Sequence, residues 1–441
     1  MTYFSKVKIS SLLISFLPIL ITIIVTYCFY PGFMSVDSLN QYVQAKKGIM
    51  NDWHPVIMSW TWHYLNFLHD GPLLMLVLQN LVFWTGMALI IYSAIKSGVW
   101  KVRITLCFLI FPPILALLST IWKDVEMGSF LVLSLGLILF GAHVNIKKKI
   151  LISPLLLFTL IYSAAVRYNS LPAVIPIVFC IGLLWINGKL WKKILVSIFL
   201  TFLIILASFL INTIGTNGEK QFPIQQILTH DLVALSLNNN KVYLPEFMSG
   251  KDNAEWKISE LRQIYTPLTV VPLYCCGNNI KHLVLTSNKR NIDELIGSWK
   301  KNTLIFFYPY LIHRADVYIQ TLSLNNGPAC YPFMYGDIPN TYGIVFHPNI
   351  VNISILNYLD FFKDSLFFRP YFYLVISIVI LFFAIWKKQL ITSLVLISGI
   401  LYNLCYFFVA TTCDFRMTWW TTLSTLIGIL LFIQGINNSK R

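Results

Sequence analysis

Long apolar stretches alternate with short polar turns along most of the chain, and this pattern predicts membrane-spanning helices. A helix needs about 20 apolar residues to cross the hydrocarbon core of a bilayer. The stretches of that length, or close to it, cover roughly residues 10–30, 73–95, 104–121, 127–146, 150–166, 171–187, 194–214, 371–386, 389–411 and 417–436. We therefore expect an all-α polytopic membrane protein with about ten transmembrane helices.

These spans divide the chain into three parts. Residues 1–214 are expected to form an N-terminal transmembrane module of seven spans, with a first outer loop at 31–72. Residues 215–370 form the longest polar stretch, and residues 371–441 form a C-terminal module of three spans. The first apolar stretch is longer than the core of a secretory signal, and no A-x-A-like cleavage site follows it. It is therefore expected to stay in the chain as an anchor.

The long polar stretch, residues 215–370, is not uniform. Residues 222–237 and 291–313 have the periodicity of helices. Residues 264–290 and 322–350 are rich in Gly, Pro, Asn and Tyr, which predicts loops with short strands at most. The sequence thus predicts a mostly helical extracytoplasmic domain with long loops.

A surface helix is also expected in the first outer loop. Asp37 or Ser38 could cap its first turn, and Gly48 suits the position after its last turn. The following segment WHPVIMSWTWHYLNFL is amphipathic and rich in Trp. Such segments are favoured at the membrane–water interface, where aromatic rings have both an apolar body and a polar edge.

Composition supports the membrane class, and charge gives an orientation. The chain is 57% hydrophobic and carries a net charge of +15, with a mean hydropathy of +0.69. One set of turns contains basic residues and no acidic ones: Lys6, Lys8, Lys96, Lys101, Arg103, Lys147, Lys148, Lys149, Lys189, Lys192, Lys193, Lys387, Lys388, Lys440 and Arg441. By the positive-inside rule this face is cytoplasmic. The basic charge is thereby explained without nucleic acid, because it lies in short turns and not in a domain.

The sequence contains eight cysteines. Half of them fall within predicted spans and are expected to be apolar filler: Cys28, Cys107, Cys180 and Cys405. A bridge from Cys330 to Cys275 or Cys276 would form in an oxidising compartment, and free thiols are the alternative. No Cys/His spacing typical of a metal site is present.

Polar side chains gather at the predicted outer ends of the spans. They are Asp37 after the first span, Lys123, Asp124 and Glu126 after the third, Arg167, Tyr168 and Asn169 after the fifth, and Asp414 and Arg416 after the ninth. Charged groups at this depth are costly and usually face a cavity or a partner. Individually they are also consistent with ordinary helix-end ion pairs, with a cap at Asp37, and with a turn residue at His54. Their joint placement favours a site.

These motifs carry a family resemblance. The order F-x-x-x-D-S-x-x-Q, W-H-P, W-K-D, R-Y-N and D-F-R resembles poorly characterised bacterial members of the GT-C class of integral membrane glycosyltransferases. Members of this class are similar in having an Asp just after the first span, which Asp37 matches, and often a D-x-D or D-x-E in the second outer loop, which Asp124 and Glu126 match. The likeness covers most of 1–214 and the segment around Arg416, and is weak over 240–360.

The resemblance implies an activity and roles for these residues. A GT-C-like bundle transfers a sugar from a polyprenyl-phosphate or polyprenyl-diphosphate donor on the extracytoplasmic face. Asp37 would be the general base on the acceptor. Phosphate or donor binding would fall to Arg167, Arg416, Lys123 and His54, and acceptor or supporting contacts to Gln41, Asp52, Asn169 and Asp414. Asp52 would orient His54.

The acidic motif and the partners complete these expectations. Asp124 and Glu126 could hold a divalent cation, Mg²⁺ or Mn²⁺, since both prefer oxygen ligands. The partners would be the lipid-linked sugar donor, membrane lipid and an envelope acceptor that is a saccharide, a lipid or a protein. We expect a multi-pass protein of the inner or plasma membrane with both termini in the cytoplasm. Which sugar and acceptor it uses, and whether a partner subunit binds, do not follow from the sequence.

Two other functions, and a non-catalytic role as an assembly subunit, are compatible with the same pattern. A transporter or flippase for a lipid-linked saccharide should carry polar groups near mid-span and internal repeats, whereas these spans are nearly free of charge. A polysaccharide polymerase or ligase would share an outer-face site but should rely on basic residues of its large loop. Replacement of Asp37 would separate it from a glycosyltransferase.

Overall fold

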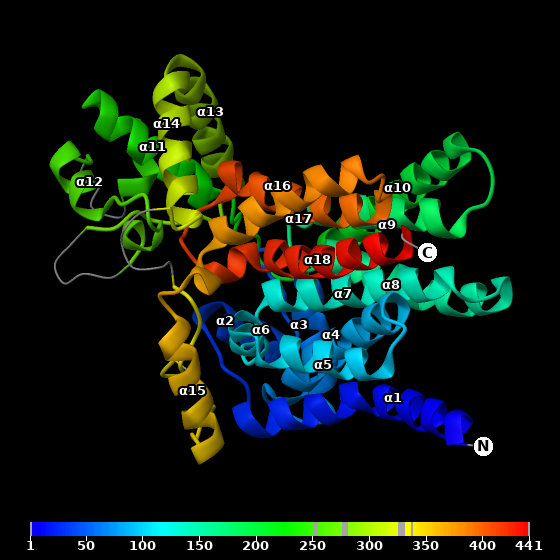
Figure 1. The fold of residues 1–441 in the computed structure, drawn as a ribbon. Coiled ribbons are helices and arrows are strands. Elements are labelled where there is room, and N and C mark those ends of the chain that lie inside the picture. Colours follow the sequence, from blue (N-terminus) through cyan, green and yellow to red (C-terminus); the bar gives the residue numbers. More distant parts are fainter. Residues whose placement is uncertain (1, 250–254, 276–280, 325–330, 337, 440–441) are drawn as a thin grey trace.

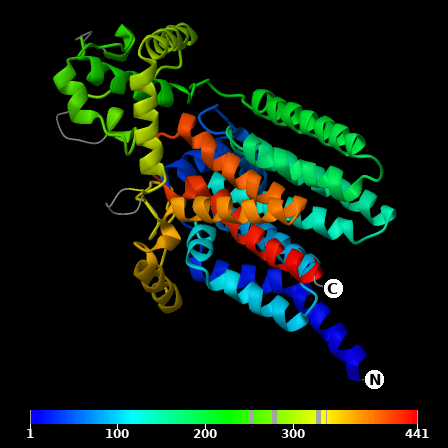
Figure 2. The same ribbon diagram turned by 45° about the horizontal axis from the view of Figure 1, so that its top comes forward.

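A bundle of long apolar helices with a polar cap at one end forms the molecule (Figure 1). The computed structural model describes residues 2–249, 255–275, 281–324, 331–336 and 338–439, with side chains described from Phe16 to Ile436. Within these ranges the chain is helical and forms only isolated β-bridges. Both termini lie at one end of the bundle, and α2 and α11–α15 lie at the other, which we call the capped end (Figures 1 and 2).

The bundle helices follow the predicted apolar stretches. They are α1 (Thr2–Phe29), α4 (Leu73–Ala94), α5 (Gly98–Ile110), α6 (Pro112–Leu118), α7 (Lys123–Ala142), α8 (Ile146–Ala165), α9 (Leu171–Trp185), α10 (Leu190–Ile214), α16 (Pro370–Trp386), α17 (Leu390–Val409) and α18 (Trp419–Ser439).

The cap contains shorter helices. They are α2 (Val36–Lys47), α3 (Val56–Asn66), α11 (Gln225–Asn239), α12 (Ile258–Ile264), α13 (Lys289–Ile305), α14 (Phe307–Thr321) and α15 (Ile350–Phe362), with 3₁₀ turns at Glu246–Ser249, Val271–Leu273, Leu366–Phe368 and Phe415–Thr418.

Length and composition make this a multi-pass helical membrane protein. Among the described residues, six helices are long and apolar enough to cross a membrane, or up to seven if one bent pair is a single span. The expected span at 104–121 is that pair, α5 and α6, with an angle of 66° between them. Pro112 and Pro113 explain the break, since proline disfavours a helical conformation at the residue before it. The number of about ten spans stays a prediction.

Helix α7 is the centre of the bundle. It is the most buried of the long apolar helices, and α10 is the least buried. A glycine pair lets α7 approach α4 closely: a Cβ on Gly136 would lie 2.6 Å from the carbonyl oxygen of Gly86. Small residues at such contacts are typical of helices that pack in membranes. Both acidic residues of the D-x-E motif lie in the first turn of this central helix.

The cap has a separate apolar core. Leu228, Leu232, Val233, Leu261 and Leu295 belong to a cluster distinct from that of the bundle. The predicted helix at 222–237 is confirmed as α11. The predicted helix at 291–313 is wrong as a single element, because the chain breaks at Phe306 between α13 and α14. Pro309 lacks the N–H that would bond to Ile305, so one continuous helix cannot pass this point.

Candidate functional site

Asp37 lies in the first turn of α2, at the capped end. The sequence placed the helix cap at Asp37 or Ser38, and this is wrong. Ser35 is the N-cap: its hydroxyl accepts from the Ser38 amide at 3.2 Å, and the Ser38 hydroxyl accepts in return from the Ser35 amide. The predicted end at Gly48 is confirmed, with a left-handed φ of 67°. With Ser35 as the cap, the Asp37 carboxylate is available for other contacts.

The backbone before α2 joins the turn that precedes α7. The Phe33 amide donates to the Ser119 carbonyl at 3.0 Å, and the Ile121 amide donates to the Phe33 carbonyl at 3.0 Å. Trp122 adds a side-chain contact, since its indole N–H donates to the Ser35 hydroxyl at 2.8 Å. These bonds bring Asp37 beside the start of α7.

A third segment, between α17 and α18, supplies the counter-charge. The Arg416 Nη2 lies 2.8 Å from Oδ2 of Asp37, and its Nε lies 3.1 Å from Oδ2 of Asp414. The guanidinium also lies over the Trp122 ring, 4.7 Å from its centroid. The Asp37 side chain is 30% exposed, so solvent or a ligand can reach this ion pair.

His54 and Lys123 complete the surroundings of Asp37. The Lys123 Nζ lies 2.8 Å from His54 Nδ1, and His54 Nε2 lies 4.0 Å from Oδ1 of Asp37. Burial, followed by the charge of Lys123, lowers the pKa of His54 to about 3, so the ring is neutral near pH 7. Because Nδ1 then accepts from Lys123, the proton is on Nε2, which faces Asp37.

These cations also control the charge of Asp37. Burial raises the pKa of its carboxyl, but the charges of Arg416 and Lys123 more than offset this effect. The net pKa lies well below the ordinary carboxyl range. Asp37 is therefore ionised, next to solvent and within reach of several hydrogen-bond donors.

A second ion pair lies close by. Arg167, in the turn between α8 and α9, pairs with the buried carboxylate of Asp124, and its Nε donates to Asn169 at 2.9 Å. The guanidinium lies 5.8 Å from the Tyr406 ring centroid. The charge of Arg167 contributes to the lowered pKa of His54, so the two ion pairs share one electrostatic field.

A cavity of about 380 Å³ adjoins this second pair. It lies between the α8–α9 turn and α10, the least buried of the long helices. Two cationic side chains line it, Arg167 and Lys220, together with Asp52, Ser208, Asn212 and Thr216. The Tyr168 hydroxyl closes one side by donating to the Asp52 carbonyl at 2.8 Å. The volume and the mixed lining suit a small polar group with an apolar attachment.

Some predicted residues have other contacts than expected. The Asp52 carboxylate accepts from the backbone amides of Gln221 and Phe222, whereas we expected it to orient His54. Gln41 donates to the backbone carbonyl of Asp37 at 3.3 Å, which keeps it beside the site. Ser35, Trp122 and Lys220 were not predicted as site residues. Trp122 is part of the W-K-D motif, whereas no sequence pattern marks Ser35 or Lys220.

The acidic motif fits a divalent ion poorly. Asp124 is engaged with Arg167, and the carboxylate oxygens of fully buried Glu126 have no hydrogen-bond partner within the described part of the chain. That part also contains no group of three or more His, Cys, Asp or Glu that could hold a metal ion. Magnesium and manganese take several oxygen ligands.

The cysteines outside the spans differ from the expectation in one respect. Cys413, directly before Asp414, is disulfide-bonded, whereas the expected bridge involved only Cys330 with Cys275 or Cys276. Cys276 and Cys330 lie outside the described residues.

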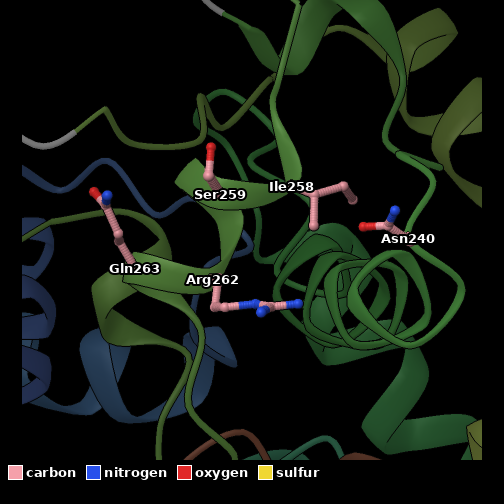
Figure 3. A pocket seen from close by; sticks show the side chains of 5 residues that line it. All are labelled: Asn240, Ile258, Ser259, Arg262 and Gln263. Atoms are coloured by element: carbon pink, nitrogen blue, oxygen red, sulfur yellow. The ribbon is translucent and has the colours of Figure 1, made fainter.

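A second cavity, of about 400 Å³, lies on the cap between α12 and the end of α11. Its lining includes Arg262, Ser259 and Gln263; the Arg262 side chain extends towards the neighbouring helix, and those of Ser259 and Gln263 extend in other directions (Figure 3). Since its polar groups do not converge, this cavity gives no indication of a ligand.

No family model, curated protein or solved structure matches this chain.

Proposed function

We propose that the protein is a glycosyltransferase that moves a sugar from a polyprenyl-phosphate or polyprenyl-diphosphate donor to an envelope acceptor. One observation carries the proposal: an ionised, partly exposed Asp37 lies among Arg416, Lys123 and neutral His54 at one end of an apolar bundle. A lipid-linked donor would bring its phosphate to this depth. The reaction would take place on the face opposite the termini, outside the cytoplasm of an inner or plasma membrane.

In this reaction Asp37 is the general base. Its carboxylate takes the proton of an acceptor hydroxyl or amide while the acceptor atom bonds to C1 of the sugar. The bond between C1 and the phosphate oxygen breaks, and its electron pair leaves with the phosphate. Donors preorganised around that oxygen lower the barrier.

Arg416 connects donor binding with the strength of the base. Its guanidinium fork fits phosphate oxygens as well as it fits a carboxylate. A donor phosphate that takes over the contact now made to Asp37 would remove the nearest positive charge from the carboxylate. The proton affinity of Asp37 would then rise, so the base would be strongest when the donor is in place.

The cavity beside Arg167 gives the donor a place. Arg167 and Lys220 would bind the phosphate or diphosphate, and the polar side chains of α10 would contact the sugar. The position next to α10 favours this assignment, because a lipid chain could follow the side of the bundle that is least buried.

The test uses membranes that contain the wild-type protein, Asp37→Asn or Asp360→Asn. Asp360 is the matched control, since it is also an ion-paired Asp at the capped end but lies on α15 with Lys363. Membranes receive radiolabelled polyprenyl-phosphate and polyprenyl-diphosphate sugars extracted from the host, together with host envelope acceptors.

We expect transfer by the wild type and Asp360→Asn and none by Asp37→Asn. Equal transfer by all three would contradict a catalytic role of Asp37. Movement of labelled lipid across the bilayer without any transfer would instead support the alternative of a flippase. Elongation of a polymer that does not require Asp37 would support a polymerase or ligase.

A further inference from the structure

The segment that carries Arg416 is bonded to the cap at three backbone positions. The Val270 amide donates to the Thr411 carbonyl at 2.7 Å, and the Tyr331 amide donates to the Cys413 carbonyl at 3.2 Å. The Phe415 amide donates back to the Tyr331 carbonyl at 3.1 Å. Residues 408–416, which we call the arginine turn, therefore take their shape from residues of the 215–370 segment.

Arg314 of α14 holds the start of this turn. Its Nη1 donates to the Ala410 carbonyl at 2.9 Å, and its Nη2 donates to the Phe408 carbonyl at 2.8 Å. Helix α17 ends at Val409, so these carbonyls belong to the helix end, where carbonyls lack an intrahelical partner. A planar fork with two donors fixes the direction in which the chain leaves α17.

Asp231 of α11 fixes Arg314 in turn. Its Oδ1 lies 3.1 Å from Nε of Arg314 and 3.1 Å from Nε2 of His313, and its Oδ2 accepts from the Trp299 indole at 2.8 Å. The Tyr265 hydroxyl lies 2.9 Å from the other nitrogen of His313. Asp231 and Arg314 are both fully buried. The carboxylate thus has a partner on each oxygen, and the guanidinium has no solvent contact.

A buried pair of this kind is poorly explained by stability alone. Desolvation of the two charges commonly cancels their attraction, and apolar residues of similar volume often replace such pairs without loss. What an apolar pair cannot supply is a fixed double donor to the Phe408 and Ala410 carbonyls. Arg416 lies six residues after Ala410, at the far end of the same turn, and reaches Asp37 from there.

From these contacts we infer that Arg314, oriented by Asp231, is a positioning residue. It sets the arginine turn and thereby places Arg416 against Asp37. The cap is then part of the site, although Arg314 itself lies away from the reacting groups. The geometric part of this inference is independent of the proposed function, and only its catalytic consequence rests on that proposal.

The test compares two variants with one control. Arg314→Met combined with Asp231→Leu removes both charges, so no unpaired charge stays buried. Arg314→Lys keeps a cation for Asp231 but loses the fork. Lys289→Ala is the control, because its ion pair with Asp293 lies exposed on α13 of the same cap.

Hydrogen–deuterium exchange on the full-length purified protein gives the first measurement. The amides of Ala410, Phe415 and Met417 are hydrogen-bonded and report on the turn. We expect exchange about 10-fold faster across 408–417 in both variants, since each loses charge-assisted bonds. Exchange in α4 and α7 of these variants, and throughout the Lys289→Ala control, should match the wild type. Unchanged exchange in 408–417, or equally faster exchange throughout the bundle, would overturn the inference.

The transfer assay gives the second measurement. A misplaced Arg416 should lower kcat by roughly 10- to 100-fold and change KM by less than about threefold. A purely structural role would lower the amount of active protein and leave the kcat of the remaining fraction unchanged. If the wild type transfers no sugar, the proposed function fails, and the exchange data still decide whether Arg314 sets the turn.

Discussion

Two Asp–Arg ion pairs of the molecule consist of the same residue types but differ in their surroundings. Asp37 with Arg416 and Asp231 with Arg314 both have a histidine at one carboxylate oxygen. The first pair is 30% and 14% exposed at its two side chains, and the second is fully buried. The same residue types therefore occur once beside solvent and once in a closed interior.

Hydrogen bonding separates the pairs further. Arg416 Nη1 and His54 Nε2 have no hydrogen-bond partner within the described part of the chain, so donors remain for a ligand. The Nη1 and Nη2 of Arg314 both donate to carbonyls, and Asp231 is bonded on both oxygens. The Nε of Arg314 has no hydrogen-bond partner within the described residues, and it lies 3.1 Å from Oδ1 of Asp231 in the ion pair. The Asp37 pair keeps donors beside a partly exposed carboxylate, as a site requires. The two terminal nitrogens of Arg314 and both oxygens of Asp231 are bonded to protein groups, as a fixed support requires.

The largest effect on stability should come from Asp231→Asn. It leaves the Arg314 guanidinium buried without its counter-charge, which costs about 3–5 kcal/mol. The midpoint of thermal unfolding of the purified protein in detergent measures this loss. Asp360→Asn, an exposed ion-paired carboxylate, should change the midpoint little. Similar small shifts of the midpoint for Asp231→Asn and Asp360→Asn would show that the buried Asp231 pair behaves like an exposed one, and would remove the distinction drawn from its burial.

Arg416→Gln should affect activity more than stability. It removes a guanidinium aimed at the developing phosphate charge, which should lower kcat/KM about 100- to 1,000-fold. The unfolding midpoint should stay near that of the wild type, because Asp37 and Asp414 are partly exposed and water can solvate them. An equal fall in protein abundance and activity would assign this pair a structural role.

Lys220→Gln tests the cavity beside the Asp37 site. Loss of one cation from a phosphate site should raise the donor KM about tenfold, which corresponds to about 1.4 kcal/mol. The change in kcat should be small, because Lys220 lines the cavity and would contact the bound donor and not the reacting carboxylate. Lys289→Gln on α13 is the control for loss of one surface charge. An unchanged KM would place the donor elsewhere.

His54 predicts that the stability of the protein falls as the pH is lowered. Its folded pKa of about 3 lies below the ordinary 6.5, so the unfolded chain binds a proton that the folded chain does not. This contribution is fully present above pH 6.5 and is lost as pH falls towards 3, by up to about 1.4 kcal/mol per pH unit. His54→Gln should flatten the fall in unfolding midpoint between about pH 7 and pH 5. Identical slopes in both proteins would show that His54 is not held neutral.

Much of this arrangement could be predicted from the sequence, for identifiable reasons. Apolar length gives the bundle helices, and the outer ends of the spans gave Asp37, Lys123, Arg167 and Arg416. Their pairing follows from tertiary contacts between segments tens to hundreds of residues apart, and a single sequence does not contain that information. The N-cap of α2 is an example: Asp37 or Ser38 was predicted and Ser35 is observed, because both Ser and Asp suit a helix start.

The Asp231–Arg314 pair was missed for a similar reason. Each residue lies in a short cap helix of ordinary amphipathic composition, where a single charged residue usually faces solvent. Adjacent ionisable residues, His230 with Asp231 and His313 with Arg314, were the available signal. The break at Phe306 also determines how α14 meets α17, and the sequence analysis predicted one helix there.

The most direct test of the account measures Asp37→Asn and Asp231→Asn side by side, for sugar transfer per folded molecule and for unfolding. We predict that Asp37→Asn folds normally and loses transfer by about 100-fold or more, and that Asp231→Asn loses stability first. The same loss of stability in both variants, with transfer by the folded fraction of Asp37→Asn intact, would contradict the assignment of Asp37 as the reacting carboxylate.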